Sequence, residues 1–366
     1  MAGGGTGGHV VPALAVSAKL KQRGATILFV GSKRAEERRL VEQAGYDFKV
    51  ISAGKLRRYW SLHNFIDPFK LVRGYLQSRK ILKEFAPDVV FAKGGYMAYP
   101  VMKAASRLGI PVVAHESDVV PGLANRLGAR YAAAIAVSLP TDRVKGLPAE
   151  KLVYTGNPIR TELIQGKPDR AYEDFGLDAN VPTALVQGGS QGSRVINELI
   201  WKALPLILDD AQVVHQVGED AEQEAAAHKA DLTTQQQRRY QPVAYLELRP
   251  HADLYAAADL VVSRSGAGAL AEIAGVGKAS ILIPHQRGGS GHQAENAKVF
   301  AETGAAIVLD EATLIAEELA RQVKALLHNP QRLAEMGRSA RTLARLDAAE
   351  KVADLVWSHG LAKGNQ

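Results

Sequence analysis

Short apolar runs rich in β-branched residues alternate along the whole chain with longer segments of helical periodicity. The runs indicate buried strands, and intervening segments such as 11–23, 34–44, 195–208 and 267–275 indicate helices. The predicted strands span residues 25–31, 48–52, 89–91, 112–115 and 134–137 in the first half, and 183–187, 212–217, 260–263, 280–284 and 306–309 in the second. Such alternation is typical of parallel sheets with helices on both faces. The sequence therefore predicts an α/β fold with doubly wound sheets.

The chain of 366 residues is long enough for two domains of about 100–200 residues each. Turn residues gather at 155–168, where we expect a linker. We predict an N-terminal domain at 1–160, a C-terminal domain at 161–345 and a cleft between them. Residues 346–366 are predicted as a C-terminal helix or tail, and the sequence leaves open whether it packs back on the N-terminal domain.

The start of the chain is unusual, because the glycine-rich stretch 3–9 follows only Met1 and Ala2. A loop of this kind normally follows a buried strand. Either the first, usually central, strand is missing or the sheet begins differently. We favour a mis-set start or a trimmed chain.

Charge is distributed unevenly between the predicted domains. The net charge of +7 combines +14 in residues 1–160, from 25 basic and 11 acidic side chains, with −7 in residues 161–366, from 20 basic and 27 acidic ones. This imbalance favours an anionic partner for the first half. The chain has no cysteine, which excludes disulfides, thiolate catalysis and metal–thiolate sites, and no apolar run reaches the roughly 18 residues of a membrane span. Together these features favour a soluble, cytoplasmic protein.

Three glycine- and serine-rich loops each precede a predicted helix: 3–9 (GGGTGGH), 187–193 (QGGSQGS) and 263–272 (SRSGAGALAE). Such loops let backbone amides approach a phosphate at a helix N-terminus, whereas plain strand–helix turns are the alternative interpretation. His9 lies where loop becomes helix and is a candidate to take a proton from a hydroxyl. Glu272 is a candidate for a ribose diol, although spacing alone favours a solvated helix charge.

Two further polar clusters follow predicted strands. The HESD stretch at 115–118 places Glu116 and Asp118 at the same sheet edge as His9, where they are candidates to orient His9 or to bind a sugar hydroxyl. Helix capping is the alternative role. The stretch 284–297 carries two histidines, but no carboxylate–histidine spacing accompanies them, so we predict no metal site.

Residues 55–83 combine apolar side chains with eight basic residues against one acid, Asp67. This composition favours a surface that lies on anionic lipid. Nucleic acid is disfavoured because no recognition module accompanies the basic residues. The candidate membrane-associating residues are Lys55, Arg57, Arg58, Trp60, Phe65 and Phe69.

Seven motifs occur in an order that resembles the MurG family of bacterial glycosyltransferases, from residue 3 to about 345. They are GGGTGGHVVPALA, KGGY, HESDVVPGLANR, TGNPIR, QGGSQGSRVIN, SRSGAGALAE and GHQAENA. The resemblance implies the GT-B fold, with two Rossmann-like domains and an interdomain cleft. It also implies transfer of N-acetylglucosamine (GlcNAc) from UDP-GlcNAc to the C4 hydroxyl of the N-acetylmuramyl sugar of lipid I, which gives lipid II for peptidoglycan synthesis.

The resemblance implies a role for individual residues as well. The N-terminal domain would bind acceptor and membrane, with His9 as general base, and the C-terminal domain would bind the donor without a cofactor or metal. The implied substrate-binding residues are Thr6, Gly7, Gly8, Asn125, Arg160, Ser190, Leu248, Ala267, Gly268, Ala269, Leu270, Ala271, Glu272 and Gln293. Expected partners are UDP-GlcNAc, lipid I, anionic inner-leaflet lipid and cell-wall synthesis proteins, at the cytoplasmic face of the membrane.

The chain departs from the family pattern at two positions. Asp118 stands where many members have the asparagine of HEQN, and His292-Gln293 stands where many have two glutamines. Two alternatives of other classes accompany the transferase hypothesis. One is a nucleotide-sugar epimerase on the same fold, and the other is a non-enzymatic nucleotide-binding membrane scaffold.

Overall fold

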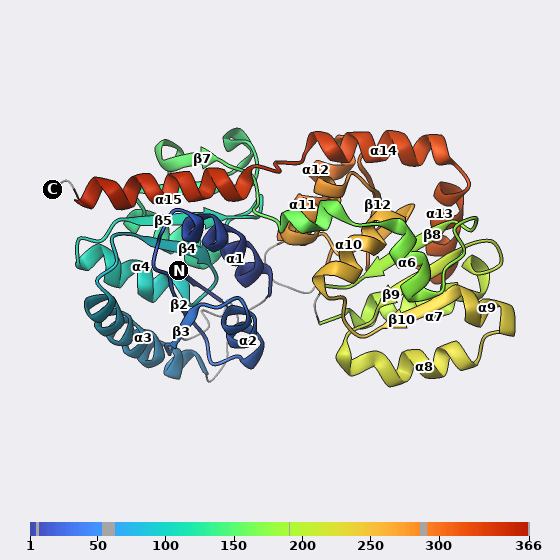
Figure 1. Ribbon diagram of the computed structural model, residues 1–366, viewed down its shortest axis with the longest axis horizontal. Helices are drawn as coiled ribbons and strands as arrows, with labels where there is room; N and C mark the ends of the chain where they lie inside the picture. Colours follow the sequence, from blue (N-terminus) through green and yellow to red (C-terminus); the bar gives the residue numbers. More distant parts are fainter. Residues whose placement is uncertain (5–6, 53–62, 190, 286–290, 365–366) are drawn as a thin grey trace. The chain divides into compact units, whose positions relative to one another are not determined.

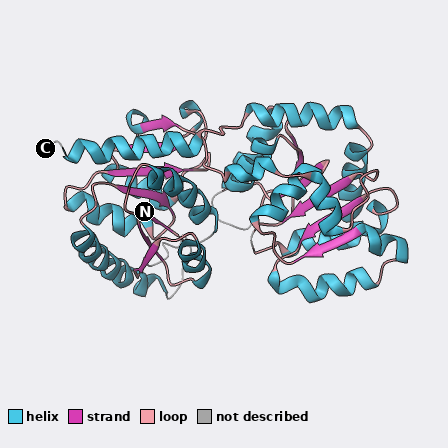
Figure 2. Cartoon of the chain, viewed as in Figure 1, coloured by secondary structure: helices cyan, strands magenta, loops and turns pink. Residues whose placement is uncertain are grey.

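The computed structural model describes residues 1–4, 7–52, 63–189, 191–285 and 291–364. The chain forms two compact units, each with one parallel sheet between layers of helices (Figures 1 and 2). The N-terminal unit comprises Met1–Arg160 together with Arg345–Gln366, and the C-terminal unit comprises Thr161–Ala344. The doubly wound α/β prediction is confirmed for both units.

The sheet of the N-terminal unit has the strand order β3-β2-β1-β4-β5-β6-β7. Its strands are β1 Ala2–Gly3, β2 Leu28–Gly31, β3 Asp47–Val50, β4 Val90–Gly94, β5 Val112–Glu116, β6 Ala134–Val137 and β7 Leu152–Tyr154. The α-helices of this unit are α1 Gly7–Gln22, α2 Ala35–Gln43, α3 His63–Phe85, α4 Ala98–Arg107, α5 Leu123–Gly128 and α15 Ala348–Gly364.

The sheet of the C-terminal unit has the order β10-β9-β8-β11-β12-β13. Its strands are β8 Thr183–Gln187, β9 Gln212–Gln216, β10 Tyr240–Val243, β11 Leu260–Ser263, β12 Ala279–Leu282 and β13 Ala306–Val308. Its α-helices are α6 Pro168–Phe175, α7 Arg194–Ile207, α8 Glu222–Ala230, α9 Thr234–Arg239, α10 Leu248–Ala257, α11 Ala267–Val276, α12 His292–Glu302, α13 Ala316–Leu327 and α14 Pro330–Thr342.

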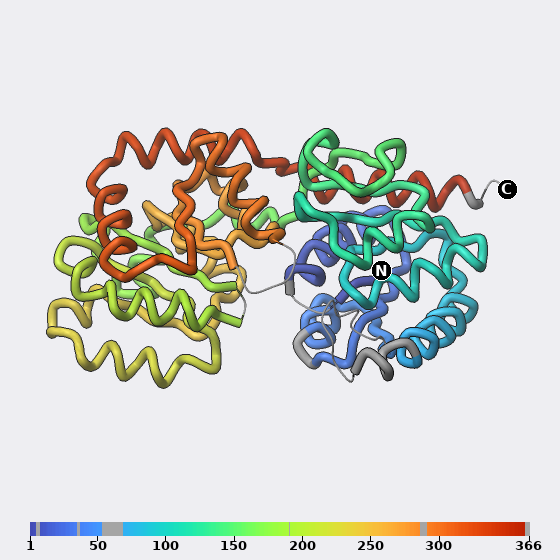
Figure 3. Tube along the Cα trace, turned by 180° about the vertical axis from the view of Figure 1, so that it is seen from behind, coloured from blue at the N-terminus to red at the C-terminus, as the bar shows by residue number. Residues whose placement is uncertain are grey.

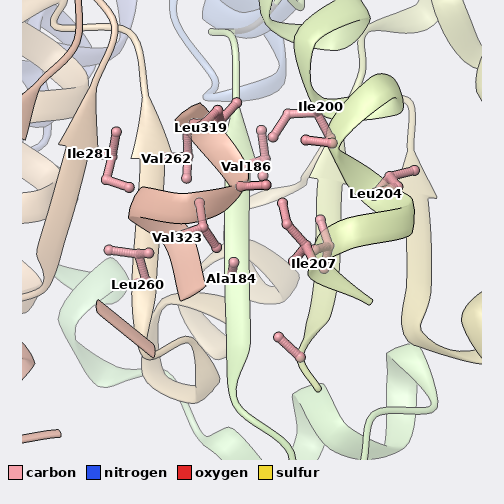
Figure 4. Close-up of a cluster of buried hydrophobic side chains, with 14 of the residues drawn as sticks. Ala184, Val186, Ile200, Leu204, Ile207, Leu260, Val262, Ile281, Leu319 and Val323 are labelled. Atoms are coloured by element: carbon pink, nitrogen blue, oxygen red, sulfur yellow. The ribbon is translucent and has the colours of Figure 1, made fainter. Parts of the chain in front are cut away.

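The pleat of the strands divides the apolar side chains of the C-terminal unit between two cores. Ala184 and Val186 of β8 face α7 and α13, where they meet Ile200 and Val323 (Figure 4). Leu185, between them in sequence, belongs to the opposite cluster with residues of α10 and α11. Because successive strand residues point to opposite faces, an unbroken apolar run is what a strand covered on both faces requires.

The first strand corrects one expectation. We favoured a sheet without its first strand, but β1 lies inside the sheet, paired in parallel with both β2 and β4. It has only two residues, and the Met1 amino group donates to the Leu28 carbonyl at 2.8 Å. A cavity of about 740 Å³ lined by residues of β2, β4, α1, α3 and α15 adjoins it.

The last helix, α15, belongs to the N-terminal unit, where it lies against α1 (Figure 3). Val352, Ala353 and Val356 are buried with Val10 and Val16 in one cluster. On the rim of this contact, Arg23 binds the carboxylates of Glu350 and Asp354. Apolar burial holds the helix, and the ion pairs fix its register.

A buried polar network lies in the core of the C-terminal unit. His215 of β9 contacts the Tyr240 hydroxyl through Nδ1 at 3.1 Å and the Asn197 amide oxygen through Nε2 at 3.1 Å. The Trp201 indole also donates to the Tyr240 hydroxyl, at 3.0 Å. Burial lowers the pKa of His215 from 6.5 to about 3, so the ring is neutral in the folded protein.

His215 should make the C-terminal unit less stable in acid. Between pH 6.5 and about 3 the unfolded chain binds a proton at this residue and the folded chain does not, so stability falls as pH falls through this window. In urea unfolding, His215→Gln should reduce the loss by about 1.4 kcal/mol per pH unit. Tyr240→Phe is the matched control, because it removes a hydroxyl but leaves the ring to titrate. Equal slopes in wild type and His215→Gln would contradict the assignment.

Candidate functional site

Each sheet has one point at which the strand order reverses. It lies between β1 and β4 in the N-terminal unit and between β8 and β11 in the C-terminal unit. Helices leave to opposite faces there and leave a crevice beyond the carboxyl ends of the strands, where doubly wound proteins bind ligands. Some of the predicted site residues that the structure describes lie near these two points: His9 follows β1, and Ala267–Ala271 with Glu272 follow β11.

His9 lies in the first turn of α1, directly beyond β1, and is partly exposed. Gly95 after β4 has φ +76°, and a Cβ there would lie 2.3 Å from the Gly4 carbonyl oxygen and 3.5 Å from His9 Nε2. Only glycine allows this approach. Loss of hydration in its protein surroundings, and secondarily the charge of Lys93, lower the pKa of His9 to about 4. A neutral imidazole is therefore available at physiological pH.

Lys93 was not singled out by the sequence, although it is the first residue of the KGGY motif. It belongs to β4, has 2% of its surface exposed and donates to the Ser117 hydroxyl. Burial lowers its pKa to about 8, against the opposing effects of Glu116 and Asp118. The available signal is a lysine placed between the apolar run 89–92 and the glycine pair 94–95.

Glu116 holds together the loop between β5 and α5. Its carboxylate accepts hydrogen bonds from the backbone amides of Ser117 at 2.8 Å, Asp118 at 3.1 Å and Gly122 at 2.9 Å. It also accepts from Asn125 Nδ2 at 2.9 Å. Burial raises the pKa of Glu116 despite these donors. Orientation of His9 by Glu116 or Asp118 stays a prediction.

In the C-terminal unit, Ser193 and Arg264 brace the loop between β8 and α7. Ser193 caps α7 by accepting from the Ile196 amide, and it also accepts from Arg264 Nη2 at 2.8 Å. Arg264, 8% exposed, forms an ion pair with Glu311 at 2.6 Å and donates to the Ile283 carbonyl. These buried contacts tie the loop to the ends of β11 and β12.

Helix α11 carries another group of predicted substrate-binding residues, Ala267–Ala271 and Glu272. A Cβ built on Gly266 or Gly268 would meet nothing within 4 Å, so space is open beside the first turn and its amides. Glu272 is half-buried in the second turn, and the Tyr255 hydroxyl donates to its Oε2 at 3.3 Å.

The remaining predicted residues are scattered over both units. Gln293 is the second residue of α12, and its side chain accepts from the His285 amide at 2.9 Å. Leu248 begins α10, where its side chain packs on the core. Arg160 ends the first segment of the N-terminal unit. Gly7 opens α1 and Gly8 is exposed. Thr6, Ser190, Lys55, Arg57, Arg58 and Trp60 lie outside the described residues, and so does the side chain of Phe65.

Helix α3 carries the described part of the predicted membrane surface. Phe69, Val72 and Leu76 are 78%, 59% and 57% exposed, at a spacing that places them on one helix face. Arg73, Lys80 and Lys83 are exposed on the same face. In the described part of the chain, no helix is long and apolar enough to cross a membrane, and no group of acidic or histidine side chains is suited to hold a metal.

Family comparisons agree over both units. Residues 1–137 match the N-terminal domain of glycosyltransferase family 28, and residues 183–354 match its C-terminal domain. A protein of Lachnoclostridium phytofermentans, named UDP-N-acetylglucosamine--N-acetylmuramyl-(pentapeptide) pyrophosphoryl-undecaprenol N-acetylglucosamine transferase, is 39% identical over 357 residues, 97% of each chain. The chain belongs to the MurG group of glycosyltransferase family 28.

Solved structures resemble the MurG-group chain over nearly its whole length. The crystal structure of Acinetobacter baumannii MurG has a TM-score of 0.74 at 29% identity and covers 97% of each chain. A putative UDP-N-acetylglucosamine 2-epimerase from Listeria monocytogenes has a TM-score of 0.72 at 13% identity, with coverage of 97% and 94%. The second likeness shows the fold alone, so it gives the epimerase alternative no weight beyond the shared architecture.

Removing the charge of Glu116 should loosen its loop. In Glu116→Gln an amide N–H₂ replaces one acceptor oxygen and faces backbone and side-chain donors, so one or more hydrogen bonds are lost. Amide hydrogen exchange of residues 117–122 should accelerate by about tenfold to a hundredfold, while β8 keeps its protection. Glu150→Gln, at an exposed position, should change neither. Wild-type exchange in Glu116→Gln would remove the proposed bracing role.

Proposed function

We propose that this chain transfers GlcNAc from UDP-GlcNAc to the C4 hydroxyl of the N-acetylmuramyl sugar of lipid I, forming lipid II and UDP for peptidoglycan synthesis. The observation that carries the proposal is the 39% identity to a transferase of this printed name over 97% of both chains. The likeness to MurG at 29% identity supports transfer over epimerisation. Four of the motifs, GGGTGGHVVPALA, KGGY, QGGSQGSRVIN and SRSGAGALAE, lie at the ends of β1, β4, β8 and β11, which flank the two points where ligands bind in such sheets.

The donor is assigned to the C-terminal unit. Ser190, Arg160 and the first turn of α11 would meet the diphosphate, Glu272 the ribose, Gln293 the GlcNAc sugar and the Leu248 backbone the uracil. Helix N-termini favour anions, and the bracing of the loop by Arg264 and Ser193 supports a fixed phosphate site. Thr6, Gly7, Gly8 and Asn125, which belong to the N-terminal unit, are also assigned to substrate binding.

The reaction is a single displacement with inversion at the anomeric carbon. Neutral His9 takes the proton of the acceptor hydroxyl as that oxygen attacks, and UDP leaves through an oxocarbenium-like transition state. Glu116 and Asp118 are the candidates to orient His9. Negative charge grows on the leaving diphosphate, where helix N-terminal amides and Arg160 stabilise it.

Radiolabelled GlcNAc transfer to a lipid I analogue tests the function and the base together. His9→Ala should lower kcat by about a hundredfold or more with UDP affinity nearly unchanged, since the imidazole acts on the acceptor proton. In wild type, kcat/KM should lose activity only as pH approaches about 4, where His9 becomes protonated.

Three outcomes would count against this assignment. Near-normal turnover in His9→Ala would remove His9 from the base role, and an acidic limb near pH 6.5 would contradict its lowered pKa. UDP release without any lipid I analogue would favour the epimerase alternative. His359→Ala in α15, remote in sequence from both loops, is the matched histidine control.

We propose further that the protein attaches peripherally to anionic lipid at the cytoplasmic face of the bacterial membrane. The apolar and basic face of α3 supports this, and so do Lys55, Arg57, Arg58, Trp60 and Phe65 by composition. Apolar side chains enter the interface while cations meet lipid headgroups. Other cell-wall synthesis proteins are proposed partners, and nucleic acid is not.

Sedimentation with vesicles containing phosphatidylglycerol tests this surface. Replacing Lys55, Arg57 and Arg58 by glutamine should lower partitioning by roughly a hundredfold at low salt, at about 1 kcal/mol per charge, and salt should weaken wild-type binding. Leu76→Ser should also weaken binding, whereas Leu206→Ser, an exposed leucine on α7, should not. If vesicle binding depends neither on salt nor on these substitutions, the proposed membrane-binding role of this surface is wrong.

A further inference from the structure

A chain of hydrogen bonds runs through the C-terminal unit from His251 to Glu272. His251 Nε2 lies 3.0 Å from Gln187 Oε1, and Gln187 Nε2 donates to the Tyr255 hydroxyl at 2.9 Å. The Tyr255 hydroxyl lies 3.3 Å from Glu272 Oε2. The four side chains come from β8, α10 and α11, and sequence analysis named only Glu272.

The chemistry of these groups determines which of them donates and which accepts in each hydrogen bond of the series. An amide oxygen only accepts, so His251 carries its hydrogen on Nε2, and a carboxylate likewise only accepts. Tyr255 accepts from Gln187 Nε2 and has one proton left to donate. Gln187 Oε1 and Glu272 Oε2 both lie 3.3 Å from this hydroxyl. The ionised acceptor forms the stronger bond, which favours Glu272.

Tyr255 is rigidly held. Its side chain is fully buried, and its ring stacks on His251 with centroids 4.4 Å apart and planes 21° from parallel. Gln187 is 4% exposed and His251 is 8% exposed. Because Tyr255 is fully buried, stacked on His251 and hydrogen-bonded to Gln187, its hydroxyl provides a fixed anchor for the partly exposed Glu272 carboxylate.

The anchor lies where the strand order of this sheet reverses. Gln187 is the last residue of β8, Ser263 is the last residue of β11, and Gln187 Nε2 also approaches the Ser263 hydroxyl at 3.4 Å. This series of hydrogen bonds therefore connects the carboxyl ends of β8 and β11, where the nucleotide crevice is predicted, to the carboxylate of Glu272.

We propose that Tyr255 is a positioning residue that holds the Glu272 carboxylate ready for the ribose diol of the donor nucleotide, with Gln187 and His251 holding Tyr255. The inference rests on the proposed donor site. Ordering the carboxylate before binding removes part of the conformational cost that the ligand would otherwise meet. The role concerns recognition of the nucleoside and leaves the chemical step to other residues.

Calorimetric binding of UDP, 2′-deoxy-UDP and 3′-deoxy-UDP tests the proposal on the full chain. Wild type should prefer UDP to at least one deoxy analogue by about tenfold. Tyr255→Phe should weaken UDP by about fivefold to tenfold and that analogue by less than about twofold, so the preference shrinks. In the transfer assay, KM for UDP-GlcNAc should rise while kcat stays within about twofold.

Further variants separate positioning from general damage. Tyr255→Phe combined with Glu272→Gln should bind UDP no more weakly than Glu272→Gln alone, because one interaction is lost in both. Tyr172→Phe, a tyrosine packed on the same core, should leave the preference intact. His251→Phe keeps a ring for stacking and removes the Nε2 donor to Gln187 together with the second ring nitrogen, so it should reduce the preference even where Tyr255→Phe folds poorly.

The results distinguish this inference from the proposed function. A full preference for UDP in both Tyr255→Phe and His251→Phe would overturn the positioning role. Loss of preference in these variants without any transfer to a lipid I analogue in wild type would support the role of Tyr255 and overturn the proposed acceptor. A wild type that binds no UDP would overturn both.

Discussion

All the strands of each sheet run in parallel, so their carboxyl ends share one edge, and the order of strands reverses once along that edge. The glycine loops and polar side chains follow β1, β4, β5, β8, β11 and β12 and can meet only there. His9 and Lys93 are far apart in the sequence. They lie close together in the structure because His9 follows β1, Lys93 belongs to β4, and these two strands are paired. The parallel arrangement is therefore the constraint on which both candidate sites depend.

The two units hold their polar groups by different physical means. The N-terminal unit buries charges, Lys93 and Glu116, and satisfies them with a hydroxyl and with loop amides. Besides the buried ion pair of Arg264 and Glu311, the C-terminal unit uses neutral donors and acceptors in series, ending on one carboxylate. Burial lowers the pKa of His9 and the charge of Lys93 lowers it further, whereas a neutral series acts only through contact and fixes direction.

Among the described residues, sequence patterns predicted most of the strands, including the partly exposed β3 and β13, and missed β1, β7 and β10. The spans 134–137, 183–187 and 260–263 agree with the structure, because their apolar runs have clear ends. The edge strand β10 contains Pro242, and β7 is half-buried with three residues, so neither has a strong apolar pattern. Glycine motifs located the loops, but Tyr255 and Gln187 look like ordinary core residues until neighbouring strands place them beside Glu272.

Because β1 is short, it is paired with its neighbours at fewer positions than β8, the corresponding strand of the other sheet. In the C-terminal unit, β8 is joined at five positions to β9 and at four to β11. In the N-terminal unit, β1 is joined to β2 at Ala2 alone and to β4 at Ala2 and Gly3. Strands β2 and β3 are thus joined to the rest of their sheet through a single paired position of β1. Helix α1, which carries His9, begins four residues beyond this two-residue strand, whereas the loops of the C-terminal crevice follow β8 and β11, which are paired along their whole lengths.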